Sequence, residues 1–160
     1  QNDWTNEDWS EKGDISELKH IFSDWHPEIQ EILESTKPGS LFKWGLHDRA
    51  PMNKWSKGRF SLLGDAAHPM LPFIAQGAAM AIEDGIVLAS SLSSFDNVAL
   101  GLNDYENKRK YRTAKAQKTA TRNATIFHLS DFFAIFRNLV MKFFIKKIMD
   151  SFYKYDAISK

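Results

Sequence analysis

The chain has 160 residues, 43% of them hydrophobic, which is enough for one domain with its own core. It contains no cysteine, which excludes disulfides and thiolate metal sites and agrees with a cytoplasmic location. Charged residues interrupt the apolar runs well before the ~18 residues that a membrane span needs, so no membrane partner is predicted.

The net charge of +1 hides an uneven distribution of charge along the chain. Residues 1–36 carry ten acidic and two basic side chains, whereas residues 101–160 carry thirteen basic and five acidic ones. A basic patch of this kind can bind nucleic acid or anionic lipid. More often it reflects solvated helix faces and attraction between the two ends, and we favour that interpretation and predict no nucleic-acid partner.

Two short helices are predicted in the acidic N-terminal part. Apolar side chains recur at spacings of three and four from Ile15 to Trp25, with Asp14 or Ser16 as a candidate N-cap. Pro27 is well placed to open a second helix, because proline is tolerated at the first helical position.

Two strands are predicted in the middle of the chain. Residues 41–48 alternate in character, which is typical of a strand with two different faces. Residues 51–57 are expected to form a turn, followed by a short buried strand over residues 59–63 between Gly58 and Gly64. Both strands would need pairing partners from outside this chain.

The segment after this second strand has the composition of a cofactor-binding loop. The strand stops at Gly64 and leaves Asp65 beyond it, and Pro69 and Pro72 then exclude regular structure. A helix with small residues at its start is predicted over residues 76–92. A strand, a glycine turn, a rigid loop and such a helix are typical of sites where backbone amides hold a cofactor.

Two longer helices are predicted to follow. The first begins near Val98 or Leu102 and continues to about Phe127, and the second runs from Ser130 or Asp131 to about Phe152.

These residues carry a resemblance to a known family. The stretch from Trp55 to Leu92 resembles the second flavin-binding motif of the FAD-dependent aromatic hydroxylases with the p-hydroxybenzoate hydroxylase fold, especially salicylate hydroxylase and 3-hydroxybenzoate 6-hydroxylase. It contains Gly-Asp-Ala-Ala-His-Pro from Gly64 and Ala-Gln-Gly-Ala-Ala-Met-Ala-Ile-Glu-Asp from Ala75. Segments outside the motif, residues 44–49, 105–109 and 122–128, are also similar to the family.

The resemblance implies a fold class and a division of the chain. We expect a helix-rich α/β structure, the C-terminal part of a p-hydroxybenzoate hydroxylase-like FAD-binding fold, with two or so strands and four to five helices. Residues 1–50 would end the substrate-domain region, 51–95 would be the flavin-binding motif and 96–160 the C-terminal helices. The chain has no Gly-x-Gly-x-x-Gly sequence, so we expect the N-terminal dinucleotide-binding half to be missing.

Roles for individual residues follow from the resemblance, each beside a plainer alternative. Asp65 would contact the ribityl and diphosphate region of FAD, or it is simply a turn aspartate. Gly77 and Ala78 would present helix-start amides to the N1–C2=O edge of the flavin, or they only allow close packing. Pro72 would form a wall beside the flavin and substrate rings, or it belongs to an ordinary proline loop.

The candidate site residues are therefore of two kinds, and neither a catalytic side chain nor a metal ligand is among them. The predicted FAD-binding residues are Gly64, Asp65, Pro72, Gln76, Gly77 and Ala78. The predicted substrate-binding residues are His47, Leu71 and Phe73.

Other polar residues near the motif receive structural interpretations. His68 is assigned to the turn rather than to acid–base chemistry. Glu83 and Asp84 are expected to interact with the dipole at the start of the helix or to make a domain contact. Asp48 and Arg49 are expected to form a salt-bridged turn.

The resemblance implies an enzyme that hydroxylates a small aromatic acid, with FAD as cofactor, NAD(P)H as reductant and O₂ as the oxygen source. The chain alone would be inactive, and exposed apolar surface could drive it to form homo-oligomers. One alternative is a non-enzymatic interaction module. The other is a membrane- or nucleic-acid-binding protein, because aromatic and basic side chains are interspersed over residues 132–152.

Overall fold

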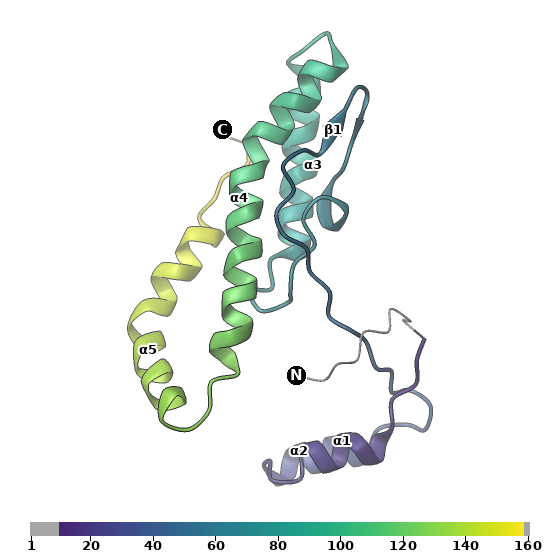
Figure 1. The fold of residues 1–160 in the computed structure, drawn as a ribbon, viewed down its shortest axis with the longest axis vertical. Helices are drawn as coiled ribbons and strands as arrows, with labels where there is room; N and C mark the ends of the chain where they lie inside the picture. The colour runs from purple at the N-terminus through teal and green to yellow at the C-terminus, as the bar shows by residue number, and fades with distance from the viewer. Residues whose placement is uncertain (1–9, 159–160) are drawn as a thin grey trace. The chain divides into compact units, whose positions relative to one another are not determined.

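The computed structural model describes residues 10–158 and divides the chain into two compact units, residues 1–46 and 47–160 (Figure 1). Within the described residues, no helix is long and apolar enough to cross a membrane. The same residues contain no group of three or more acidic, histidine or cysteine side chains that could hold a metal ion.

The first unit contains two short helices, α1 (Ile15–Ile21) and α2 (Pro27–Glu34). The Asp14 carboxylate accepts a hydrogen bond from the Ser16 amide at 2.7 Å, so Asp14 is the N-cap of α1. Pro27 occupies the start of α2. Both predicted helices are confirmed.

The strand predicted over residues 41–48 is wrong. Among the described residues, this segment forms only an isolated antiparallel bridge between Lys12 and Phe42. Backbone hydrogen bonds join Gly13 to Leu41 and Lys43 to Glu11, and the pairing ends there. A strand needs an extended neighbour along its whole length, and among the described residues only this short stretch lies alongside.

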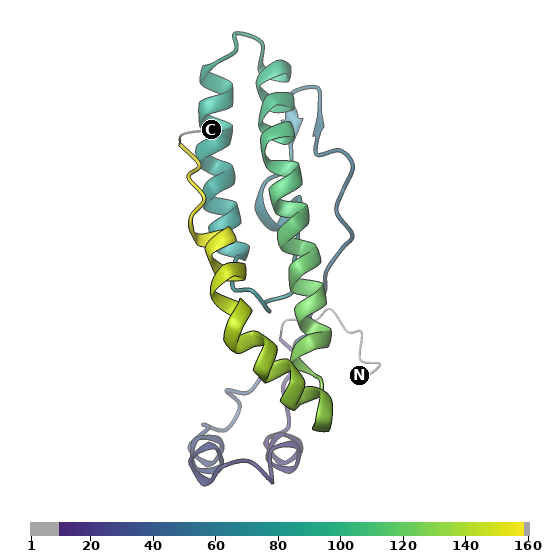
Figure 2. The same cartoon turned by 90° about the vertical axis from the view of Figure 1, so that its left-hand side faces the viewer.

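The second unit is built on two antiparallel helices that lie side by side in both views (Figures 1 and 2). They are α3 (Gly77–Ser93) and α4 (Val98–Phe127), and a third helix, α5 (Asp131–Tyr153), turns back along α4. The Asn97 side chain accepts a hydrogen bond from the Ala99 amide and caps α4. These ends match the predicted ones to within one residue, with α4 taking the earlier predicted start.

A small hairpin precedes α3, and it corrects the second predicted strand. Strand β1 (Ser56–Lys57) pairs antiparallel with β2 (Phe60–Ser61). Gly58 has a φ of +61° in the two-residue loop between them, and a glycine there makes the tight turn possible. The predicted turn over residues 51–57 therefore ends in a strand. A strand is present within the predicted range, but it is not buried, since Phe60 is 82% exposed. It pairs with β1, so the expected partner from outside the chain is also wrong for this strand.

The core of the second unit lies in two clusters along α3 and α4. Trp55, Val87 and Tyr105 belong to one cluster, and Met80 and Phe152 to the other. The helix-rich α/β class is confirmed, with five helices, two strands and one short 3₁₀ helix, η1 (Gly64–Ala66), in the described part.

Candidate functional site

The glycine at the start of η1 is required by its backbone and by its neighbours. Gly64 has a φ of +59°, a conformation that residues with a side chain rarely adopt. A Cβ atom there would lie 3.2 Å from the Cβ of Ala81 on α3. The Gly64 amide also donates to Asp84 Oδ2 at 3.1 Å. These contacts hold the turn against α3.

The Asp65 carboxylate lies beside the first residue of α3. A Cβ atom built on Gly77 would be 3.9 Å from Asp65 Oδ1, so the structure brings these two predicted site residues together. Asp65 is exposed. Within the part of the chain that the structure describes, its carboxylate takes part in no hydrogen bond, so its acceptor atoms are available to a ligand.

The N-terminus of α3 has backbone donors without a side-chain partner. Gln76 is the N-cap residue, and its side chain makes no capping hydrogen bond. The first amides of a helix have no partner within the helix, and they carry the positive end of its dipole. Gln76 is buried, whereas Gly77 is half-buried and Ala78 exposed. This end of α3 can therefore donate hydrogen bonds to an electron-rich group.

Side chains of α4 hold the proline loop before α3. Gln117 Nε2 donates to the Pro69 carbonyl at 3.0 Å, and Asn123 Nδ2 donates to the Phe73 carbonyl at 3.1 Å. Ala75, at the end of the loop, has a φ of +51°, and its amide donates to the Pro72 carbonyl at 3.1 Å. A non-glycine residue in this conformation indicates a constrained backbone.

The predicted substrate residues do not gather in one place. Phe73 packs edge-on against Phe127 of α4, with ring centroids 6.0 Å apart. Leu71 packs against the core cluster that contains Met80, and His47 is exposed. Pro72 is exposed and borders, with Phe73, an apolar hollow that includes neither Leu71 nor His47.

The apolar hollow was not predicted. It has a volume of about 1020 Å³ and lies between α4, α5 and the proline loop. Its aromatic lining includes Phe127, Phe133, Phe136 and Phe144. Its sequence signal is the run of aromatic residues in α5, the same run that suggests a membrane- or nucleic-acid-binding protein as an alternative.

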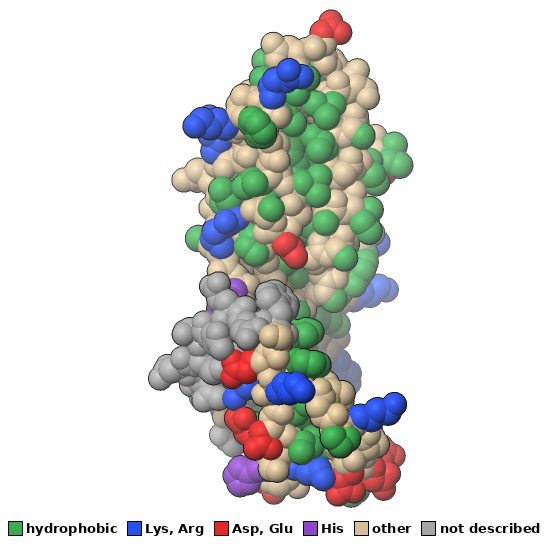
Figure 3. Space-filling view, turned by 90° about the vertical axis from the view of Figure 1, so that its right-hand side faces the viewer, with side chains coloured by type: hydrophobic (Ala, Val, Ile, Leu, Met, Phe, Trp, Pro, Cys, Tyr) green, Lys and Arg blue, Asp and Glu red, His purple; other side chains and the backbone are tan. Residues whose placement is uncertain are grey.

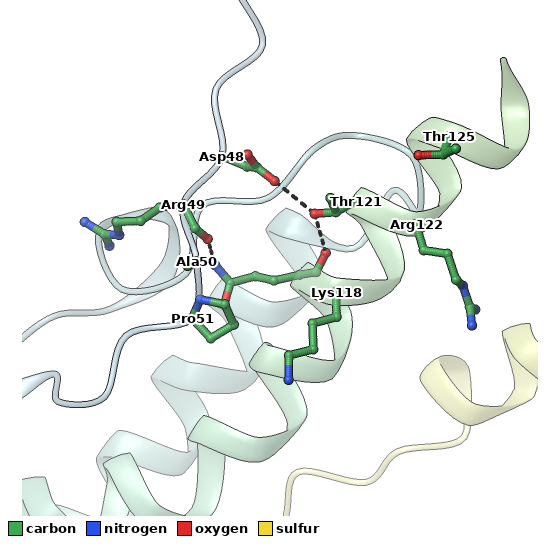
Figure 4. Close-up of a pocket in the computed structure, with 9 residues that line it drawn as sticks. Asp48, Arg49, Ala50, Pro51, Lys118, Thr121, Arg122 and Thr125 are labelled. Carbon is green, nitrogen blue, oxygen red and sulfur yellow. Dashed lines mark hydrogen bonds between the residues drawn. The ribbon is translucent and has the colours of Figure 1, made fainter.

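The predicted salt bridge between Asp48 and Arg49 is wrong, because each residue has another partner. Asp48 Oδ2 accepts a hydrogen bond from the Thr121 hydroxyl at 2.9 Å, and the Arg49 side chain points away from it (Figure 4). Arg49 donates instead to the Ala66 carbonyl at 2.8 Å, at the end of η1. The surrounding hollow has a volume of about 450 Å³. Lys118 and Arg122 on its rim point in different directions.

A buried ionic cluster lies directly behind the turn. Asp84 and Arg109 are fully buried, with Arg109 Nε 2.7 Å from Asp84 Oδ1. His68 Nε2 lies 2.6 Å from Asp84 Oδ2. Burial raises the pKa of Asp84, but hydrogen bonds from His68 and Arg109 outweigh it and hold this pKa below its usual value. Asp84 is therefore a carboxylate, and His68 Nε2 carries the hydrogen.

The dipole role predicted for Glu83 and Asp84 is wrong. α3 begins at Gly77 and has no acidic residue in its first turn, so both carboxylates lie beyond the amides that a cap would satisfy. Glu83 Oε2 lies 2.7 Å from Arg109 Nη1, and Glu83 Oε1 lies 2.6 Å from Arg112 Nη2. These residues join α3 to α4. The burial of His68 agrees with its predicted structural role.

A second buried carboxylate joins α4 to the hairpin. Glu106 Oε2 accepts hydrogen bonds from the amides of Trp55 and Ser56 at 3.0 and 2.9 Å. Burial raises the pKa of Glu106, but these two amides more than compensate and lower it overall. The neighbouring Tyr105 hydroxyl donates to the Leu62 carbonyl at 3.3 Å, and burial raises the pKa of Tyr105.

This chain is similar to known proteins in sequence and in structure. A family model described as an FAD binding domain matches residues 3–120. The 6-hydroxynicotinate 3-monooxygenase of Pseudomonas fluorescens is 43% identical over 120 residues, which are 74% of this chain and 30% of that protein. The 3-hydroxybenzoate 6-hydroxylase of Klebsiella oxytoca is 34% identical over 150 residues, 92% of this chain and 36% of that protein.

Solved structures show the same likeness. HpxO of Klebsiella pneumoniae, solved in complex with FAD and uric acid, has a TM-score of 0.76 and 27% identity over 86% of this chain and 36% of that one. A salicylate hydroxylase substrate complex has a TM-score of 0.74 and covers 98% of this chain and 39% of that one, at 24% identity, which shows the fold alone. The chain thus spans about a third of the length of these proteins. It belongs to the FAD binding domain family, to which the flavin-binding motif in its sequence pointed.

Proposed function

We propose that this chain forms one side of the FAD site in a monooxygenase that hydroxylates a small aromatic acid, with NAD(P)H as reductant and O₂ as oxygen donor. The observation that carries the proposal is the exposed, unpartnered Asp65 carboxylate beside the uncapped N-terminus of α3. An acceptor and a set of donors, side by side, suit the polyol chain and the ring edge of a flavin. FAD, when bound, would supply the redox and oxygen-transfer chemistry.

The chain's own residues would bind and orient the cofactor. Asp65 would accept hydrogen bonds from ribityl hydroxyls, and the Gly77 and Ala78 amides would donate to the N1–C2=O edge. Gly64 and Gln76 would shape the backbone on either side of this site. Pro72, exposed in a loop that α4 holds by its carbonyls, would lie beside the ring system and exclude water from it.

A dinucleotide-binding part would complete the site, and the greater length of the relatives leaves room for such a part. The relatives are about two and a half times as long as this chain. The second unit also exposes apolar side chains on the side that carries the hairpin (Figure 3). Phe60, Leu63 and Ile82 are among the exposed apolar residues of this unit. Burial against another part of the enzyme would remove this surface from water. The chain alone is then expected to be inactive.

The substrate class rests on the names of the relatives. They act, by those names, on 6-hydroxynicotinate, 3-hydroxybenzoate and 3-amino-4-hydroxybenzoate, all small aromatic acids. His47, Leu71 and Phe73 remain candidates for contacts to such a ring. A cytoplasmic location and a homo-oligomeric state belong to the same proposal.

A chimeric enzyme tests the proposal. This chain would replace the matching third of 6-hydroxynicotinate 3-monooxygenase from Pseudomonas fluorescens, to which it is 43% identical. We expect a yellow protein whose NADH oxidation is stimulated by small aromatic acids, and a loss of bound flavin on Asp65→Ala. Glu28→Ala, in the exposed helix α2, is the matched carboxylate control. A folded chimera without flavin would contradict the proposal and favour a non-enzymatic interaction module.

A further inference from the structure

One buried carboxylate joins the turn that carries Asp65 to two helices. Asp84, on α3, accepts from the Gly64 amide at 3.1 Å and from His68 Nε2 at 2.6 Å. Its other oxygen accepts from Arg109 Nε of α4 at 2.7 Å. Asp84 is fully buried, so it cannot itself touch a ligand at the surface.

The groups that Asp84 binds lie on both sides of Asp65. Gly64 precedes it, and His68 follows it at the end of the same short turn. The turn lies close against α3 at this point, since a Cβ built on Gly64 would lie 3.2 Å from the Ala81 Cβ. Arg49 also holds this turn, because its Nη2 donates to the Ala66 carbonyl at 2.8 Å. The position of the Asp65 carboxylate beside Gly77 therefore depends on contacts that are made behind it.

We propose that Asp84 is a positioning residue for flavin binding: it sets the distance between the Asp65 carboxylate and the N-terminus of α3. The inference rests on the proposed flavin site. His68 is its partner in this role, because its Nε2–H fixes the far end of the turn to the same oxygen that holds Gly64. Arg109 orients Asp84, since its Nη2 also donates to the Met80 carbonyl, one turn earlier on α3.

The rest of the ionic cluster provides an internal control. Glu83 joins Arg109 to Arg112, and Arg112 donates to the Phe152 carbonyl at 3.0 Å and lies over the Tyr155 ring at 3.8 Å. These contacts stabilise the packing of α3, α4 and the C-terminal segment. None of them touches the turn that carries Asp65. A change at Arg112 should therefore lower stability without moving the flavin-binding groups.

The test compares four variants of the whole chain: Asp84→Asn, His68→Leu, His68→Gln and Arg112→Gln. Each is titrated with FAD to millimolar concentrations, with binding followed by amide NMR signals, and each is unfolded with urea. His68→Leu removes the donor to Asp84, whereas His68→Gln keeps an amide donor at a similar reach. Hydrogen exchange of the Gly64 amide reports the turn itself, without any flavin present.

We expect Asp84→Asn and His68→Leu to weaken FAD binding about tenfold or more and to speed Gly64 exchange by a similar factor, as for loss of a charge-assisted hydrogen bond. His68→Gln should retain affinity within about twofold. Arg112→Gln should lower the urea midpoint and leave affinity unchanged. If Asp84→Asn does not fold, the two His68 variants decide.

Three results would overturn the inference, and the third is distinguishable from the first two. The first is equal FAD affinity in the unaltered chain and in His68→Leu. The second is an equal loss of FAD affinity in His68→Leu and Arg112→Gln. Either would show that the cluster acts only on stability. No FAD binding by the unaltered chain at any concentration would overturn the proposed site, and the positioning role with it.

Discussion

Replacing Gly64 by alanine should lower the free energy of unfolding. The loss should be larger than at a turn glycine, such as Gly58, with open space at its Cβ position. Gly64 lies at a φ of +59°, and a Cβ there would stand 3.2 Å from the Ala81 Cβ. The left-handed conformation costs an L-residue about 1–2 kcal/mol. The reduced freedom of the unfolded chain offsets about 0.4–1 kcal/mol of this.

The close contact adds a second cost, because the site is buried and Ala81 belongs to a helix that cannot shift freely. Overpacking of this kind costs about 1 kcal/mol or more. The sum predicts a loss of about 2 kcal/mol for Gly64→Ala, which corresponds to about 4–8 °C in Tm. FAD affinity should fall too, since the Gly64 amide is displaced from Asp84.

Gly58 provides the matched control for this prediction. Its φ is +61°, and no atom lies within 4 Å of a Cβ built there. Gly58→Ala should therefore show the conformational cost alone, about 1 kcal/mol. Urea unfolding of both variants measures the difference. Equal losses in the two variants would refute the reasoning, because the contact between the turn and α3 would then contribute nothing.

The remaining predictions concern the helices and the buried carboxylates. Gly85→Ala should raise stability by about 0.5–1 kcal/mol in urea unfolding, because Gly85 is exposed inside α3 and nothing lies near its Cβ position. Glu106→Ala should cost about 3 kcal/mol, since it leaves the buried amides of Trp55 and Ser56 without an acceptor, whereas Glu106→Gln should cost about 1 kcal/mol. The folded-state pKa of Asp84 is lowered, so its stabilisation is complete above the unfolded value of about 3.9 and is lost as the pH falls through the lower folded value. Urea midpoints measured from pH 7 down to about pH 2 should fall less steeply in Asp84→Asn than in the unaltered chain, and parallel curves would contradict this.

The helices could be predicted from the sequence because their signals are local. Asp14, Pro27 and Asn97 stand at helix starts, where their chemistry is favourable in any surroundings. The spacing of apolar residues and the positions of prolines predicted the other helix ends. The family resemblance pointed to Asp65 and Gly77 as flavin-binding residues, and the structure brings these two together.

The strands and the ionic cluster depend on partners far away in the sequence. The alternation over residues 41–48 is typical of a strand, but only a short stretch of the described chain lies beside it. Asp84 and Arg109 are 25 residues apart, and a periodic pattern cannot reveal which acid of one helix meets which base of another. The one available signal was that both lie in segments that resemble the family. The Gly58 turn signal was present, but the apolar run after it favoured a buried strand.

The most direct test of the flavin site is the set of backbone amide shifts that FAD causes in the whole chain. The chain is titrated with FAD, with the smaller flavin FMN, and with AMP, which contains no flavin. FAD and FMN should each shift the amide signals of Asp65, Gly77 and Ala78, and AMP should leave these signals unchanged. Shifts confined to the α5 surface, or equal shifts with AMP, would contradict the proposal that Asp65 and the start of α3 form one side of a flavin site.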